Sequence, residues 1–126
     1  MPLSGDSSCI GRARRHAAEF LTRARSRGVA VSARALDLTQ LVVSELVTNA
    51  IKYAPGPLRM ELRIVADTTV EVSVQDSVRA QPAALPVDPT RIGRHGLEIV
   101  RAVVQAFHVR LEPVGKRVTA HIALTD

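Results

Sequence analysis

The stretch that decides the fold runs from Leu41 to Ala54 and reads LVVSELVTNAIKYA. Its apolar residues recur every three or four positions, the spacing that places side chains on one face of an α-helix. Asp37 or Thr39 is a candidate N-cap, and Pro55 with the glycine after it ends the pattern. The stretch therefore predicts an amphipathic helix around which the domain is organised.

A polar stripe interrupts this helix. Glu45, Thr48, Asn49 and Lys52 lie at positions i, i+3, i+4 and i+7, so they share one side. A carboxylate and a carboxamide one turn apart make a candidate site for a hard cation and a polarised water. The plainer interpretation is a solvated helix face, and the stripe taken alone favours it.

Composition is that of a single globular domain. The 126 residues are 46% hydrophobic and 23% charged, which excludes a disordered chain. No apolar run approaches the ~20 residues of a membrane span, and the first residues lack the apolar core of a signal peptide. Cys9 is the single cysteine, which suits a reducing compartment. We therefore expect a cytoplasmic protein without membrane association.

The net charge of +5 comes almost entirely from arginine. It indicates a nucleic acid, a polyanionic ligand, an acidic protein partner or an arginine-rich coding bias. The chain has no block of five or more Lys/Arg residues and too few aromatic residues for base stacking. Direct binding to nucleic acid is therefore not expected.

The pattern before the central helix predicts a flexible start over residues 1–9 and a domain over residues 10–126. A helix is expected from about Ile10 to Arg27, ended by Gly28, with its arginines mostly on a solvated face. A partner-binding surface is the alternative for these arginines. Val29 to Ala35 is expected to be a connector.

After the central helix the period changes from 3.6 to 2. Leu58 to Ile64 and Val70 to Val74 each alternate apolar with polar residues and predict two antiparallel strands. Asp76 falls where the second strand ends, a place that commonly presents side chains to ligands.

Ser77 to Arg94 has no periodicity and holds three prolines, so we expect a lid loop over about residues 77–95. It leads through Gly93 and Gly96 into a helix over Leu97 to Phe107, whose N-terminus could bind phosphate. Two further strands follow, Val109 to Leu111 and Val118 to Leu124, joined by a Gly115-Lys116 turn. This order predicts an α+β sandwich with helices on one face of a mixed, mostly antiparallel sheet.

Three signals resemble the GHKL ATPase superfamily in order and spacing. SELVTNAIKYA resembles its N-box, Asp76 after a strand resembles the first residue of its G1 box, and GRHGLEIV resembles its G2 box. The similarity is greatest to the short bacterial ATP-binding proteins of the anti-sigma factor serine kinase type. It covers roughly Ile10 to Leu124 and implies a Bergerat, or histidine-kinase-like, ATPase fold that binds ATP and Mg²⁺.

The resemblance also implies residue roles. Glu45 would be the general base, Asn49 the Mg²⁺ ligand, and Asp76 the acceptor of the adenine amino group. Positive charge near the phosphates would come from Lys52 or Arg94, although both are expected to be ordinary surface residues. The phosphate cradle would consist of Gly93, Gly96 and the backbone of Arg94, His95 and Leu97.

Several positions depart from the family pattern. The G1 box is usually Asp-x-Gly-x-Gly, but here residues 76–80 read DSVRA, without either glycine. Gly115-Lys116-Arg117 stands where many members have Gly-x-Thr, so Thr119 is the candidate substitute. Tyr53 occupies a place often held by His. These 126 residues show no substrate-histidine region and no dimerisation helix pair, so a complete sensor kinase is not expected.

Three functions remain open. The first is a serine/threonine kinase that phosphorylates a STAS-type anti-sigma factor antagonist, binds a sigma factor, or does both. The second is a non-catalytic nucleotide-sensing interaction module on the same fold. The third is a basic nucleic-acid-binding domain. Glu45 favours the first, the missing glycines favour the second, and the spread of arginines through the chain disfavours the third. A homodimer stays open.

Overall fold

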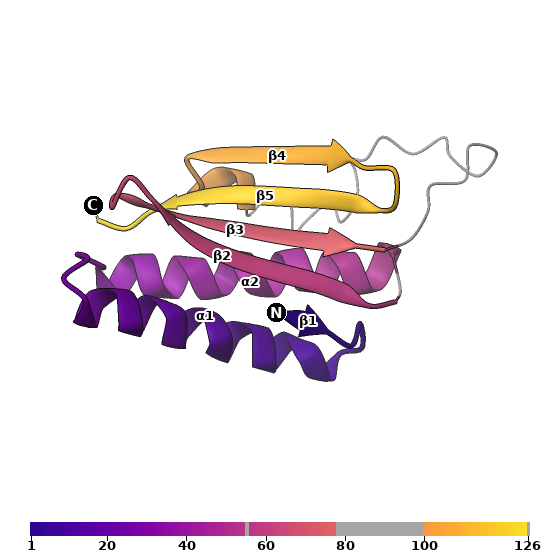
Figure 1. Ribbon diagram of the computed structural model, residues 1–126, viewed down its shortest axis with the longest axis horizontal. Coiled ribbons are helices and arrows are strands. Elements are labelled where there is room, and N and C mark those ends of the chain that lie inside the picture. Colours follow the sequence, from indigo (N-terminus) through magenta and orange to yellow (C-terminus); the bar gives the residue numbers. More distant parts are fainter. Residues whose placement is uncertain (55, 78–99, 126) are drawn as a thin grey trace.

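The computed structural model describes residues 1–54, 56–77 and 100–125. Two helices, α1 (Ser8–Ser26) and α2 (Ala33–Tyr53), lie side by side under one face of a five-stranded sheet (Figure 1). The strands are β1 (Pro2–Leu3), β2 (Leu58–Val65), β3 (Thr69–Asp76), β4 (Ala106–Leu111) and β5 (Lys116–Ala123). The predicted α+β sandwich is confirmed.

Sheet order is β1-β2-β3-β5-β4, and each pair of neighbours among the described strands is antiparallel. The alternation of apolar and polar residues in the strands determines which side chains lie on each face of the sheet. Val70, Val72 and Val74 of β3 are buried toward the helices, while Glu71 and Gln75 point to the other face and stay partly exposed. The core thus lies between the sheet and the two helices, and the opposite face of the sheet is polar.

The N-terminus differs from the predicted flexible start. Pro2 and Leu3 pair with Arg59 and Leu58 of β2, and Leu3 is buried. The amino group of Met1 also donates to the carbonyl of Met60 over 2.8 Å. A two-residue strand has no periodicity, so the sequence pattern could not indicate it.

The central helix begins earlier than predicted. Ser32, rather than Asp37 or Thr39, is its N-cap, because the Ser32 hydroxyl accepts from the N–H of Ala35 over 3.0 Å. Thr39 instead lies inside the helix and donates to the Ala35 carbonyl over 2.7 Å. The last residues of the predicted connector, Val29 to Ala35, therefore belong to the first turn of α2, which begins at Ala33.

The predicted helix up to Phe107 is too long. Residues 100–103 are helical, but the N–H of Gln105 already donates to the carbonyl of His121 over 2.8 Å, and β4 begins at Ala106. Phe107 stands opposite Ala120 in the β4–β5 pair. Apolar spacing alone did not separate the end of the helix from the start of the strand, because both place apolar residues in the same core.

Candidate functional site

Several connections meet at one end of the sandwich. The C-terminus of α2, the end of β3 and the β4–β5 connection all lie at this end (Figure 1). A Cβ at Gly5 would lie only 1.9 Å from the carbonyl oxygen of Gly56, so the β1–α1 and α2–β2 connections touch there. The Ser77 hydroxyl donates to the carbonyl of Pro57 over 3.1 Å. The end of β3 is therefore held against the chain that leaves α2.

Asp76 is the last residue of β3 and is buried, with 5% of its surface exposed. Its place in the alternation, after Val72 and Val74, points its side chain toward the helix layer. Its Oδ1 accepts the backbone N–H of Lys116 over 3.1 Å. A buried carboxylate that accepts a backbone N–H is held in one orientation, as a ligand-reading group requires.

Gly115 is packed against the backbone of Asp76. Its φ is +85°, and a Cβ there would lie 1.9 Å from the Asp76 carbonyl oxygen and 2.9 Å from its Oδ1. Only glycine combines this backbone conformation with such a close approach. The β4–β5 connection thus brings the Lys116 N–H to the carboxylate of Asp76.

Lys116 adds positive charge to the same place. Its side chain is on the face of Asp76, because it has the parity of the buried Val118. Desolvation lowers the pKa of the Lys116 ammonium, and the negative charge of Asp76 partly opposes this shift. A half-buried cation beside a buried carboxylate is an arrangement suited to a charged ligand.

Asn49 is the polar residue of α2 that is buried most deeply at this end, with 8% of its surface exposed. Its side chain makes no hydrogen bond to any residue that the structure describes. Every fully buried side-chain N or O atom of the described residues has a partner, so the amide of Asn49 is reached by solvent and is accessible to a ligand. Asn49 is buried on α2, and Asp76 is buried on the face of β3 that points to the helices.

Glu45 lies one helical turn before Asn49 and is half-buried. Within the described part of the chain its carboxylate has neither a hydrogen bond nor an ion pair. Lys52 is exposed in the last turn of α2, and its ammonium lies 5.4 Å from the centre of the Tyr53 ring. The predicted stripe is therefore graded, with Asn49 inward, Glu45 intermediate and Lys52 outward.

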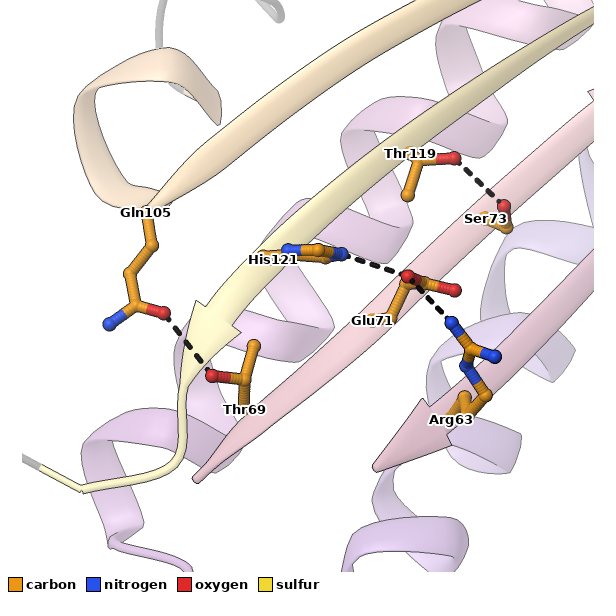
Figure 2. A network of polar contacts seen from close by, with 7 residues as sticks. All are labelled: Arg63, Thr69, Glu71, Ser73, Gln105, Thr119 and His121. Carbon is orange, nitrogen blue, oxygen red and sulfur yellow. Dashed lines mark hydrogen bonds and ion pairs between the residues drawn. The ribbon is translucent and has the colours of Figure 1, made fainter. Parts of the chain in front are cut away.

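Thr119 is not brought to this site. It pairs with Ser73 in register, and their hydroxyls share a hydrogen bond of 3.0 Å on the face of the sheet that points away from the helices (Figure 2). Asp76 points to the opposite face. Thr119 therefore does not take the place of the family threonine, and Val118 and Lys116 occupy the positions on the Asp76 side.

The outer face also holds an ion-pair network. The Nε2 of His121 donates to Oε2 of Glu71 over 2.8 Å, and Arg63 donates to the same oxygen over 3.2 Å (Figure 2). The bond from His121, and then that from Arg63, lower the pKa of the Glu71 carboxyl although partial desolvation opposes them. Among the described residues no group of three or more His, Cys, Asp or Glu side chains could hold a metal ion.

The predicted phosphate cradle, Gly93, Arg94, His95, Gly96 and Leu97, lies outside the described residues, as does the lid apart from Ser77. Sequence reasoning missed the parts played by Gly115 and the Lys116 backbone. The sequence did indicate both parts separately: it predicted a turn at Gly115 and Lys116, and it placed Asp76 at the end of a strand. What the sequence lacked was the β3–β5 register that brings them together.

The fold is that of a GHKL ATPase domain. A family model, the histidine kinase-like ATPase domain, matches residues 9–122. The chain therefore belongs to this family, whose domains bind ATP, generally with Mg²⁺. None of the curated proteins compared with the chain matches it significantly.

Two solved structures share the fold. The histidine kinase domain from the Erythrobacter litoralis EL346 blue-light activated histidine kinase has a TM-score of 0.60 at 23% identity, over 91% of this chain and 61% of that one. A longer chain of the same blue-light activated kinase has a TM-score of 0.58 at 26% identity, over 75% of this chain and 32% of that one. This chain thus spans less than two thirds of either structure. No described helix is long and apolar enough to cross a membrane.

Proposed function

We propose that this protein is a cytoplasmic ATP-binding regulator that phosphorylates a serine or threonine of a STAS-type anti-sigma factor antagonist, binds a sigma factor, or does both. The observation that carries the nucleotide site is the buried Asp76 carboxylate, oriented by the Lys116 N–H at the end of β3. Family membership supports ATP as the ligand. The partner proteins rest on the resemblance to anti-sigma factor serine kinases.

Asp76 would accept a hydrogen bond from the adenine amino group. Its role needs an ionised acceptor in a dry place, and the 5% exposure of the residue supplies the second condition. Gly115 adds no side chain at its close contact with Asp76, so the β4–β5 connection reaches the carboxylate through its backbone. Lys116 would balance the negative charge.

Asn49 would hold Mg²⁺ through its side-chain oxygen. The donor set fits this ion, since Mg²⁺ keeps several waters and takes few protein ligands together with substrate phosphates. Asn49 is 8% exposed as a residue, and its side chain has no hydrogen-bond partner among the described residues, which leaves the amide available to a ligand. When bound, Mg²⁺ neutralises phosphate charge and orients the transferred group.

Glu45 would take the proton of the attacking hydroxyl. In the balanced step, the serine or threonine oxygen of the partner bonds to the γ-phosphorus and ADP leaves. The half-buried Glu45 carboxylate, with no ion pair among the described residues, is available as a base. The cradle of Gly93, Arg94, His95, Gly96 and Leu97 remains a proposal from sequence, and the exposed position of Lys52 favours an ordinary surface role.

The second candidate is a non-catalytic nucleotide-sensing interaction module. The observation that favours it is the sequence DSVRA at residues 76–80, where the family pattern has two glycines. Without them the backbone cannot approach the adenine as closely, so affinity would fall. A module that only senses nucleotide does not need a base at Glu45.

Titration calorimetry with ATP, in the presence and absence of Mg²⁺, tests the site. We expect Asp76→Asn to weaken ATP binding by about 1–3 kcal/mol, because an amide NH₂ replaces one acceptor oxygen. The remaining amide oxygen can still accept the Lys116 N–H, so the fold should persist. Asn49→Ala should instead remove the Mg²⁺ dependence of binding. Absence of ATP and ADP binding at millimolar ligand would refute the site.

A further inference from the structure

The basic charge of the protein is concentrated on the helix layer. Residues 12–34 carry seven arginines and a single acid, a net charge of +6, whereas the whole chain carries +5. The sequence spreads arginine along its length, but α1 and the start of α2 hold nearly half of it. The rest of the molecule is close to neutral.

Part of this charge forms a stripe on α1. Arg12, Arg15 and Arg23 lie at i, i+3 and i+11 with Glu19 between them, so they share one side of the helix. All four are exposed. The buried residues of α1 face the other way; they are Cys9, Ala13, Ala17, Leu21 and Ala24. We call Arg12, Arg15, Glu19 and Arg23 the α1 stripe.

The stripe has no partner within the described residues. The ion pairs there join Arg63, Arg117 and His121 to carboxylates of the sheet and its connections. Arg25, on another side of α1, has a structural role, since its guanidinium donates to the carbonyl of Val31 over 2.8 Å and 3.2 Å. No such contact holds the arginines of the stripe.

The charges of the stripe act on α1 in both directions. The first turn of α1 contains no acidic residue, and Arg12 follows directly after that turn. Arg12 and Arg15 also repel each other at i, i+3. Glu19 stands four residues from both Arg15 and Arg23, a spacing at which opposite charges attract, and Arg23 lies in the last turn, where the helix dipole favours a cation.

We propose that the α1 stripe is a docking surface for an acidic helical segment of a partner protein. The stripe runs along about 16 Å of helix axis, at about 1.5 Å per residue, and matches three turns of a helix beside it. Carboxylates of the partner pair with the three arginines, and a basic residue of the partner faces Glu19. Neither nucleotide nor the catalytic residues take part, so the surface can be tested separately from the proposed nucleotide site.

Glu19 decides between a protein and a nucleic acid. A carboxylate in the middle of the stripe is repelled by a continuous row of phosphates, whereas a protein can place a lysine opposite it. The aromatic side chains that stack on bases are also scarce, since the chain has two Phe, one Tyr and no Trp. Charge complementarity therefore favours a protein.

The test is fluorescence anisotropy with a synthetic acidic helical peptide. The peptide carries glutamates at the spacing of the three arginines and a lysine opposite Glu19, and a scrambled peptide and a short DNA duplex are compared with it. We expect the wild-type protein to bind the designed peptide most tightly and to lose affinity as salt rises. Arg12→Glu/Arg23→Glu should weaken binding by about tenfold.

The matched control is Arg59→Glu/Arg110→Glu, which changes net charge equally on the outer face of the sheet. It should leave peptide binding within about twofold, because these residues are remote from α1. Arg12→Gln/Arg23→Gln, with a smaller effect in the same direction, replaces the charge reversal if that variant fails to fold. Equal weakening by the outer-face control would overturn the proposal, since binding would then follow net charge alone.

Glu19→Lys provides a test of sign. It should weaken binding of the designed peptide, because the peptide lysine loses the carboxylate that it faces. It should strengthen binding of the DNA duplex, because a negative charge that repels phosphates is replaced by a positive one. Tighter wild-type binding to the duplex than to the peptide assigns the stripe to nucleic acid instead and overturns the protein partner. Failure of the designed peptide to bind, or binding equal to that of its scrambled version, overturns it as well.

Discussion

At the scale of single residues, the site depends on the close contact between Gly115 and Asp76. We predict that Gly115→Ala lowers the free energy of unfolding and displaces the Asp76 carboxylate. The new Cβ would meet the Asp76 carbonyl oxygen at 1.9 Å, and alanine is also strained at a φ of +85°. Strain of this backbone kind costs about 1–3 kcal/mol, and the clash adds to it. Urea denaturation measures the loss.

Gly28→Ala is the matched control. Gly28 has a φ of +96°, but nothing lies within 4 Å of a Cβ built there. It should therefore show the backbone strain without the clash, and ATP affinity should stay unchanged. If both variants lose equal stability and both keep wild-type ATP affinity, the contact with Asp76 has no special role.

The faces of the strands were readable from the sequence, but the contacts between strands were not. In β5 the apolar Val118, Ala120 and Ile122 alternate with polar residues, so Thr119 had to face away from the core. The same count puts Asp76 on the core side of β3. The Lys116–Asp76 bond joins positions that are 40 residues apart, and it depends on a register that local patterns do not contain.

At the scale of elements, α2 carries the polar residues and its start fixes their orientation. We predict that Ser32→Ala destabilises the protein by about 0.5–2 kcal/mol, because the N–H of Ala35 loses its acceptor. Ser7→Ala is the control, since Ser7 occupies the same position of α1 and makes no side-chain cap hydrogen bond. Thermal unfolding compares them, and equal losses would show that the cap bond contributes nothing.

The start of α2 escaped prediction for a physical reason. The apolar pattern becomes clear only from Leu36 onward, whereas Ala33 and Arg34 are helix formers that carry no periodic signal. Ser32 is also tied to the far end of the chain, since its N–H donates to the carbonyl of Leu124 over 2.9 Å. A tertiary contact thus helps to fix where the helix begins.

The sheet has its own pH dependence through Glu71. Because its folded pKa lies below the ordinary value, its contribution to stability is complete above the unfolded pKa of about 4.5 and is lost as pH falls through the folded pKa. We predict that Glu71→Gln removes this part of the loss of stability at acid pH. The contribution to the free energy of unfolding is about 1 kcal/mol or less for such a pair. Urea midpoints at neutral and acid pH measure it.

Glu61→Gln is the control for the sheet. Glu61 is exposed on the same outer face of β2 and takes no part in an ion pair among the described residues. The Glu61→Gln variant should lose as much stability at acid pH as the wild type does. If Glu71→Gln also matches the wild type, the network with His121 and Arg63 does not contribute to acid stability.

At the scale of the whole molecule, the two layers divide the work. On the polar outer face of the sheet, charged side chains pair with one another, whereas the proposed ligand-binding residues Asn49 and Asp76 are buried on the helix side. The helix layer adds a basic surface that the nucleotide site does not use. Catalysis and partner binding would then be separable by mutation.

The kinase hypothesis is decided by Glu45. We predict that Glu45→Ala retains ATP binding but slows phosphoryl transfer to a serine of an antagonist protein by about 10²–10⁴, the usual effect of removing a general base. Asn49→Ala should lose both the Mg²⁺ dependence of binding and the transfer, which separates a ligand of the ion from a base. Transfer of radiolabelled phosphate from ATP, with each variant and the wild type, measures the rate.

Glu45 is half-buried and has no ion pair within the described residues, so its truncation should change the fold little. Equal transfer by wild type and Glu45→Ala would remove this residue from the mechanism, because a base in contact with the attacking hydroxyl cannot be lost without a change in rate. ATP binding without transfer to any antagonist would instead favour the non-catalytic module. The missing glycines at residues 78 and 80 would then be explained as the loss of a catalytic nucleotide geometry that a sensor does not need.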